Sequence, residues 1–134
     1  MKQQNTPQAK SVRMRQTVHR KTILSIFDKA HAPLAVDEIH QRMPKADLVT
    51  IYRNVERLTS MGIIRIVRFR DDKVRYEMSR DGHHHHVVCE SCGHIDELPE
   101  CRMRHEESVA REAPSFMKVT DHALEYFGVC KKCA

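Results

Sequence analysis

The sequence predicts an α+β fold in two parts: three helices with a β hairpin, followed by a smaller α/β part rich in cysteine and histidine. The charge changes sign between them, because residues 1–79 carry 16 Lys and Arg against 8 Asp and Glu, and residues 80–134 carry 7 against 10. Seven of the ten histidines and all five cysteines follow residue 82. We therefore expect domains at residues 1–79 and 83–134, joined by a hinge at residues 80–82.

Three helices are predicted in the basic part, near residues 17–31, 36–43 and 47–61. The side-chain oxygens of Thr17 and Asp47 can cap the first and the third. Proline follows the first two helices, and Gly62 ends the third.

The third predicted helix has two different faces. An apolar stripe at helical spacing is formed by Leu48, Ile51, Val55 and Leu58. The opposite face carries groups that can contact base edges and phosphates in a major groove, namely Thr50, Arg53, Asn54 and Arg57. Because the surrounding part is strongly basic, we expect this face to bind double-stranded DNA rather than to be an ordinary solvated surface.

A β hairpin follows this helix. Residues 63–70 and 73–78 read as two β-strand segments, and they flank an Asp-Asp turn at residues 71–72. Three helices followed by a basic hairpin is the element order of a winged helix-turn-helix. The hairpin cations Arg68, Arg70 and Lys73 can follow the DNA backbone or a minor groove.

In the second part, extended segments are predicted at residues 83–88, 95–98, 117–120 and 122–127, with a helix at residues 103–113. Two C-x-x-C units, Cys89 with Cys92 and Cys130 with Cys133, supply four thiolates, a complete tetrahedral shell for a structural Zn²⁺. A single unit can also be a redox dithiol, but the second unit favours the metal. Their wide separation would tie the end of the chain to the first strand of this part. Cys101 has no predicted role, and an idle thiol is the default interpretation.

Residues 83–86 are four consecutive histidines. In an extended strand the side chains alternate, so His83 and His85 face one way and His84 and His86 the other. Residues two apart are separated by about 7 Å, close enough for two imidazoles to converge on one ion. The run can therefore supply two sites on opposite faces. Imidazole suits zinc, iron, nickel or copper, and added carboxylates favour iron or manganese.

The N-terminal residues are polar and basic, and no apolar run approaches the roughly 18–20 residues that span a bilayer. We therefore expect a cytoplasmic protein with no membrane partner. In that compartment thiols bind metals more often than they form disulfides.

Together these residues resemble the ferric uptake regulator (Fur) family of metal-responsive bacterial repressors. The similarity covers nearly the whole chain and is carried by Thr17-x-x-Arg20, Val49-Thr50-Ile51-Tyr52-Arg53-Asn54, Tyr76-Glu77, His84-x-His86-x-x-Cys89-x-x-Cys92-Gly93, His122 and Cys130-x-x-Cys133. The resemblance implies a winged-helix domain joined to an α/β dimerisation domain, in a homodimer. It also implies that metal loading sets the angle between the domains.

The resemblance further implies roles for particular residues. DNA contacts are implied at Tyr52 and Arg53, with Arg20 beside them, and the structural zinc site at the four C-x-x-C cysteines. A regulatory site between the domains is implied at Glu77, His84, His86 and Glu97, with His31 the only candidate for a further ligand. An additional site is implied at His83, His85 and His122, with its remaining ligand near His105 or Glu106.

The sequence departs from the family pattern at His85, where an aspartate is common. A histidine-rich shell favours zinc over ferrous iron. Peroxide-sensing members typically have an aspartate where this chain has Glu97, and this difference argues against peroxide sensing. We expect a repressor of metal-homeostasis genes that reads a near-palindromic operator, with Zn²⁺ or Fe²⁺ as regulatory ion and Mn²⁺ as an alternative. The other hypotheses are a peroxide-sensing regulator, a small zinc enzyme with Glu97 as its base, and a metal buffer. The last two leave the basic helix unexplained.

Overall fold

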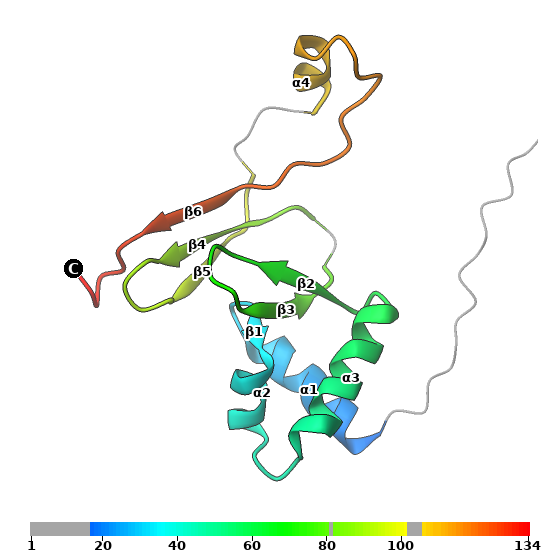
Figure 1. Cartoon of the computed structure of the whole chain (residues 1–134), viewed down its shortest axis with the longest axis vertical. Coiled ribbons are helices and arrows are strands. Elements are labelled where there is room, and N and C mark those ends of the chain that lie inside the picture. Colours follow the sequence, from blue (N-terminus) through cyan, green and yellow to red (C-terminus); the bar gives the residue numbers. More distant parts are fainter. Residues whose placement is uncertain (1–16, 81, 102–105) are drawn as a thin grey trace, which may run out of the picture.

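The computed structural model describes residues 17–80, 82–101 and 106–134 (Figure 1). The elements in these ranges, in chain order, are α1 (Val18–Lys29), β1 (Leu34–Ala35), α2 (Val36–Arg42), α3 (Leu48–Ser60), β2 (Ile64–Arg68), β3 (Val74–Met78), β4 (His85–Cys89), β5 (Ile95–Leu98), α4 (Glu106–Glu112) and β6 (Glu125–Gly128). The strands form two sheets, with the orders β1-β3-β2 and β5-β4-β6. Helices α1–α3 lie beside the first sheet, whereas α4 projects from the opposite end of the molecule (Figure 1).

Local sequence accounts for the ends of the helices. Thr17 accepts a hydrogen bond of 3.3 Å from the backbone N–H of Arg20, and Asp47 accepts one of 2.8 Å from that of Thr50. These bonds satisfy donors that the first turn of a helix leaves unpaired. Gly62 follows α3 with a φ of 70°, a left-handed conformation that favours glycine. The predicted starts of α1 and α3 and the predicted stop of α3 are confirmed.

Helices α1–α3 and the first sheet enclose an apolar core. Its fully buried members include Ile23, Ile39, Ile51, Val55 and Leu58. Three of these belong to the predicted apolar stripe of α3. The prediction that Leu48, the fourth member of the stripe, is buried is wrong, because Leu48 is 44% exposed. It is the first residue of α3, a position that the buried cluster does not reach.

Strands β2 and β3 form the predicted hairpin, and β3 also pairs with β1. The register places Arg65 of β2 opposite Glu77 of β3. The turn is held by Arg75, whose guanidinium donates two hydrogen bonds of 2.7 Å to the carboxylate of Asp71. This pairing lowers the pKa of Asp71.

In the second sheet, β4 pairs with β5 in antiparallel and with β6 in parallel orientation. The parallel pairing sets Cys89 opposite Gly128, so the second C-x-x-C unit lies beside the first, as predicted. The strand predicted at residues 117–120 is wrong: this segment does not pair, and Met117 is 99% exposed. The strand predicted at residues 122–127 begins only at Glu125.

The helix predicted at residues 103–113 is present as α4, although residues 103–105 lie outside the described part of the chain. Within that described part, no helix is both long enough and apolar enough to cross a membrane.

A second apolar cluster joins the two sheets. Phe69, directly after β2, packs with Val88 of β4 and Ile95 of β5. The guanidinium of Arg70 lies 4.0 Å from the centre of the Phe127 ring in β6. The hairpin turn therefore rests on the second sheet. The division into domains at residues 80–82 stays a prediction, and these contacts would bridge it.

Candidate metal sites and DNA-binding face

The four C-x-x-C cysteines converge beyond the ends of β4 and β6. Their sulfur atoms all lie within 4.8 Å of one another, and Sγ of Cys92 is 3.7 Å from Sγ of Cys130. Zn–S bonds of ~2.3 Å in a tetrahedron separate the sulfurs by about 3.8 Å. The four-cysteine cluster (Cys89, Cys92, Cys130 and Cys133) therefore has the spacing of a tetrahedral metal shell.

The electrostatics of the four-cysteine cluster also suit a cation. The backbone N–H of Cys130 donates a hydrogen bond of 3.3 Å to Sγ of Cys89, and this bond, with one from Cys92, lowers the pKa of Cys89 to about 6. In contrast, the neighbouring sulfurs of Cys130 and Cys92 raise the pKa of Cys133 to about 12. Several thiolates at this spacing repel one another unless a cation lies among them, and metal binding drives the remaining protons off.

A second group of donors lies between the hairpin and the second sheet. The carboxylate of Glu77, on β3, lies 3.1 Å from Nε2 of His84 and 3.0 Å from Nε2 of His86. His86 lies in β4 and His84 directly precedes this strand, and the two alternate residues share one face, as predicted for the histidine run. Glu77 and His86 are both more than nine-tenths buried. Glu77, His84 and His86, here called the Glu77 cluster, offer three convergent ligand atoms.

Glu77 is ionised at neutral pH. Burial raises its pKa, but hydrogen bonds from His86, Arg65 and His84 outweigh burial and lower the pKa to about 2. The Arg65 Nε donates a bond of 2.7 Å to Glu77, and another guanidinium nitrogen lies 3.2 Å from Nε2 of His84. The guanidinium thus contacts the same atoms that would bind a metal. Nothing in the sequence pattern had singled Arg65 out.

The other two expected ligands of the regulatory site lie apart from the Glu77 cluster. Glu97 is opposite His86 in the sheet register and lines the same small hollow as Glu77, but its carboxylate is 3.7 Å from the guanidinium of Arg80. His31 is exposed in the loop before β1. Three of the five expected ligands therefore converge in this structure.

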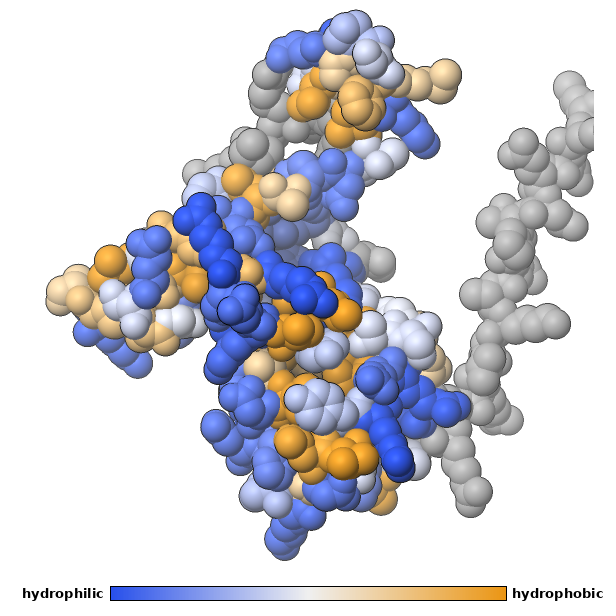
Figure 2. Space-filling view, in the orientation of Figure 1, coloured by the Kyte–Doolittle hydropathy of each residue, from blue (hydrophilic) through white to orange (hydrophobic). Residues whose placement is uncertain are grey.

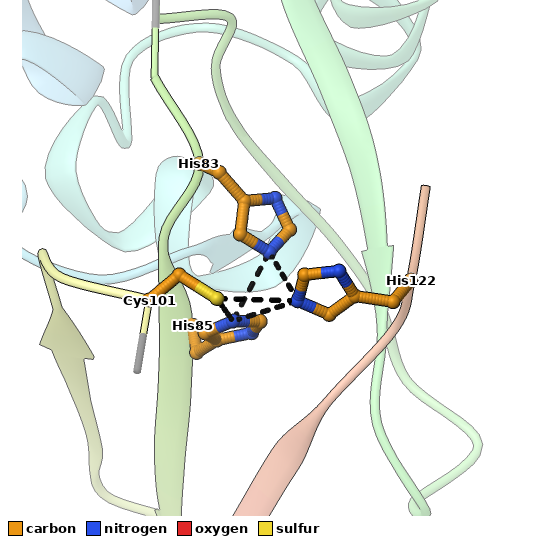
Figure 3. Close-up of side chains that lie close together, drawn as sticks. All are labelled: His83, His85, Cys101 and His122. Carbon is orange, nitrogen blue, oxygen red and sulfur yellow. Dashed lines mark hydrogen bonds between the residues drawn. The ribbon is translucent and has the colours of Figure 1, made fainter. Parts of the chain in front are cut away.

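On the opposite face of the histidine run, three imidazoles and a thiol point toward one another (Figure 3). Nε2 of His83 lies 3.0 Å from both Nε2 of His85 and Nε2 of His122. Sγ of Cys101 lies 3.2 Å from Nε2 of His85 and 3.3 Å from Nε2 of His122. His83, His85, Cys101 and His122 are called the His83 cluster below.

Cys101 is the member of the His83 cluster that sequence reasoning missed. His105, expected near this site, lies outside the described residues, as does the side chain of Glu106. The register of β4 with β5 sets His85 opposite Leu98, so the chain three residues beyond Leu98 is close to His85. This register could have indicated that Cys101 joins the cluster, but the register is known only once the pairing of the two strands is known. Burial lowers the pKa of His85, which favours the neutral ring that binds metals.

The exposed face of α3 presents the side chains predicted to contact DNA. Tyr52, Arg53 and Arg57 are exposed. Thr50 and Asn54 are half-buried and already engaged: the Thr50 hydroxyl donates to Asp47, and the Asn54 amide donates to the Thr50 carbonyl.

The same face continues into α1. A surface hollow is lined by Thr17, His19, Arg20, Thr50, Arg53, Asn54, Glu56, Arg57 and Ser60. Arg20 lies mostly beneath this surface, because only 6% of it is exposed. A direct DNA contact by Arg20 stays a prediction.

The fold and its clusters define a winged helix-turn-helix protein with candidate metal sites. The chain belongs to the ferric uptake regulator family, because residues 11–127 match the model of that family. The family consists of transcriptional regulators, and the predicted resemblance and fold class are confirmed.

The chain is similar to several different kinds of regulator. It is 29% identical over 119 residues to the ferric uptake regulation protein of Bacillus subtilis, covering 84% of this chain and 79% of the relative. It is 31% identical over 124 residues to the peroxide-responsive repressor PerR of Staphylococcus aureus, covering 90% and 82%. Its fold matches that of a zinc-bound manganese uptake regulator with a TM-score of 0.67 and 30% identity, covering 87% of this chain and 91% of the other.

Proposed function

We propose that this chain represses genes of metal homeostasis, and that a divalent cation at the Glu77 cluster sets its affinity for DNA. One observation carries the proposal: the Glu77 cluster draws ligands from the hairpin and from the second sheet. A cation at this cluster binds well only when these two parts are together. Its binding free energy then differs between arrangements of the molecule, which is the requirement for a metal-driven switch.

The chemistry of the donors supports two kinds of cation site. The four-cysteine cluster suits a structural Zn²⁺, which holds the end of the chain against β4. Two imidazoles and a carboxylate at the Glu77 cluster suit Zn²⁺ or Fe²⁺ as the regulatory ion, with Mn²⁺ as an alternative. The zinc-bound manganese uptake regulator supports cation control in a protein of this fold.

The proposed partner of the basic part is duplex DNA, and the proposed assembly is a homodimer. Strand β6 is an edge of the second sheet, and apolar side chains gather around α4 at the end away from α1–α3 (Figure 2). The exposed apolar residues of the C-terminal part of the chain include Val109, Phe116, Met117, Tyr126 and Val129. A second copy would cover such surface. Two copies of α3 held about 34 Å apart would read half-sites one DNA turn apart.

DNA-binding titrations test the role of the Glu77 cluster. A duplex selected from a random pool by the metal-loaded protein is titrated with protein in Zn²⁺, Fe²⁺ or Mn²⁺, the iron series without oxygen. The affinity of the unmodified protein rises with at least one cation, and that of His86→Ala does not, because a ligand is lost. His94→Ala is the matched control, since His94 is exposed and contacts Asp96 rather than the cluster. A normal metal response in His86→Ala would show that the cluster is not the sensor.

A peroxide-sensing regulator is the second candidate, favoured by the similarity to PerR. The same titration separates it from the first candidate. If peroxide abolishes DNA binding by the iron-loaded protein and spares the zinc-loaded protein, the chain senses peroxide; equal binding before and after treatment supports metal homeostasis.

A further inference from the structure

The His83 cluster contains a conflict that hydrogen bonding cannot resolve. The Nε2 atoms of His83, His85 and His122 form a triangle with sides of 3.0, 3.0 and 3.4 Å. In a neutral imidazole, such a nitrogen either donates a proton or offers a lone pair. With three atoms and two roles, at least one side of the triangle joins two donors or two lone pairs. A cation that accepts a lone pair from each nitrogen removes the conflict.

One neighbour fixes the orientation of the His85 ring and the position of its proton. Nδ1 of His85 lies 3.1 Å from the backbone carbonyl oxygen of Leu124. A carbonyl only accepts, so Nδ1 carries the proton and Nε2 of the neutral ring presents its lone pair to the cluster. Metal-binding histidines are typically held in this way through their other ring nitrogen. His85 is only 4% exposed, so the ring has little freedom to turn elsewhere.

Sγ of Cys101 contacts two corners of this triangle and lies within 4.8 Å of the third. Zn–N bonds of ~2.0–2.1 Å and a Zn–S bond of ~2.3 Å predict edges of about 3.3 Å between nitrogens and about 3.5 Å from nitrogen to sulfur in a tetrahedron. The nitrogen–nitrogen sides and the sulfur distances of 3.2 and 3.3 Å are close to these values. Figure 3 shows the four side chains arriving from different directions around one point.

We propose that Cys101 is the fourth ligand of a thiolate-containing zinc site with His83, His85 and His122. The resemblance to the family implied a cation at the three histidines with another ligand from near His105 or Glu106; the sulfur ligand is instead read from the position of Cys101 in this structure. Among the described residues, the cluster contains no carboxylate. Three imidazoles and a thiolate favour zinc, whereas Fe²⁺ and Mn²⁺ are better held where carboxylates contribute.

The proposed site also closes the segment that carries α4. The chain leaves the cluster at Cys101 and returns to it at His122, with 20 residues between them. A cation bound by both residues closes this loop and removes part of the entropy that ordering it costs. Zinc at the His83 cluster is therefore expected to hold α4 and its exposed apolar residues in place.

Cobalt spectroscopy of the full chain tests the sulfur ligand directly. Zinc is left in the four-cysteine cluster, the weaker sites are emptied with a mild chelator, and Co²⁺ is added to the unmodified protein and to Cys101→Ser. The unmodified protein should gain a near-ultraviolet sulfur-to-cobalt charge-transfer band that Cys101→Ser lacks. Cobalt that exchanged into the four-cysteine cluster would give the same band in both proteins. Equal bands in the two proteins, or none in either, would overturn the proposal.

Zinc affinity and loop protection provide a second readout. Loss of an outer-shell partner costs about 10–100-fold in metal affinity, so loss of the Cys101 ligand should weaken zinc binding by more than about tenfold. Zinc should slow amide hydrogen exchange in α4 of the unmodified protein but not of Cys101→Ser. Zinc affinity and exchange rates that are the same in both proteins contradict the assignment.

Two further variants keep the test decisive. Cys101→Asp restores a ligand without sulfur, so it should bind Co²⁺ without the charge-transfer band and shift preference toward Fe²⁺ and Mn²⁺; a retained band would overturn the proposal even if Cys101→Ser folds poorly. His86→Ala should keep the band, because His86 lies on the other face of the histidine run. Failure of this site is thereby distinguishable from failure of the proposed regulatory site.

Discussion

At the scale of single residues, Arg65 is a cationic side chain in direct contact with the Glu77 cluster. Its guanidinium lies opposite Glu77 in the sheet and contacts both the carboxylate and His84. It supplies a positive charge where a regulatory cation would bind. A metal ion must therefore displace this side chain or share the carboxylate with it.

Replacing Arg65 is expected to tighten metal binding at the Glu77 cluster. Because the Arg65 side chain is 45% exposed, its ion pair with Glu77 is screened by solvent, and we expect a gain of about 1 kcal/mol, or about fivefold in affinity. The measurement is chelator competition with Zn²⁺ on Arg65→Ala, with Arg68→Ala as a control that removes the same charge from the same strand. Unchanged or weaker binding in Arg65→Ala would show that the guanidinium does not compete.

At the scale of elements, α3 serves two purposes on opposite faces. Ile51, Val55 and Leu58 are fully buried, and Arg53 and Arg57 are exposed. Stability and the proposed DNA binding are therefore expected to depend on different residues of one helix. A change on the exposed face should alter binding without altering folding.

Arg57→Ala is expected to weaken DNA binding and leave thermal stability unchanged. If Arg57 contacts a phosphate, the slope of log affinity against log salt should fall by about 1, with similar loss on all sequences; if it contacts a base, the loss should be about 1–3 kcal/mol and specific to one position. Fluorescence anisotropy over a salt series measures both. Arg111→Ala, which removes a charge from α4 at the far end of the molecule, is the control. Binding equal to that of the unmodified protein would remove Arg57 from the DNA-binding face.

At the scale of the whole molecule, Phe69 links the hairpin of the first sheet to the second sheet. Its ring packs with Val88 and Ile95, and it meets the ring of His86 edge-on at a centroid distance of 5.5 Å. The guanidinium of Arg75 also lies over this ring, 5.4 Å from its centre. The hairpin turn is thus in contact with a candidate ligand of the regulatory cation.

Phe69→Ala is expected to separate metal binding from DNA binding. The Glu77 cluster keeps its ligands, so metal affinity should change little, whereas the metal-dependent gain in DNA affinity should shrink. Calorimetric metal titrations and DNA-binding titrations on the same preparation measure the two quantities. The control is Phe116→Ala, since Phe116 is 65% exposed. A full metal-dependent gain in Phe69→Ala would contradict this coupling.

Much of this architecture was predictable from short stretches of sequence. The caps at Thr17 and Asp47, the stop at Gly62 and the two faces of α3 depend only on residues within a few positions of one another. The two faces of the histidine run likewise follow from the alternation of side chains along a strand. The failed strand at residues 117–120 shows the limit, because extended sequence forms a strand only where a partner is available.

The sequence alone determined the types of ligand, the positions of the first three helices and the charge of the two parts. Tertiary structure alone decided that Cys101 contacts His85 and His122, that Arg65 contacts the Glu77 carboxylate and that Phe69 rests on the second sheet. These contacts join residues that are far apart in the chain or separated by a turn. They depend on strand register and on the packing of one sheet against the other, which no local pattern specifies.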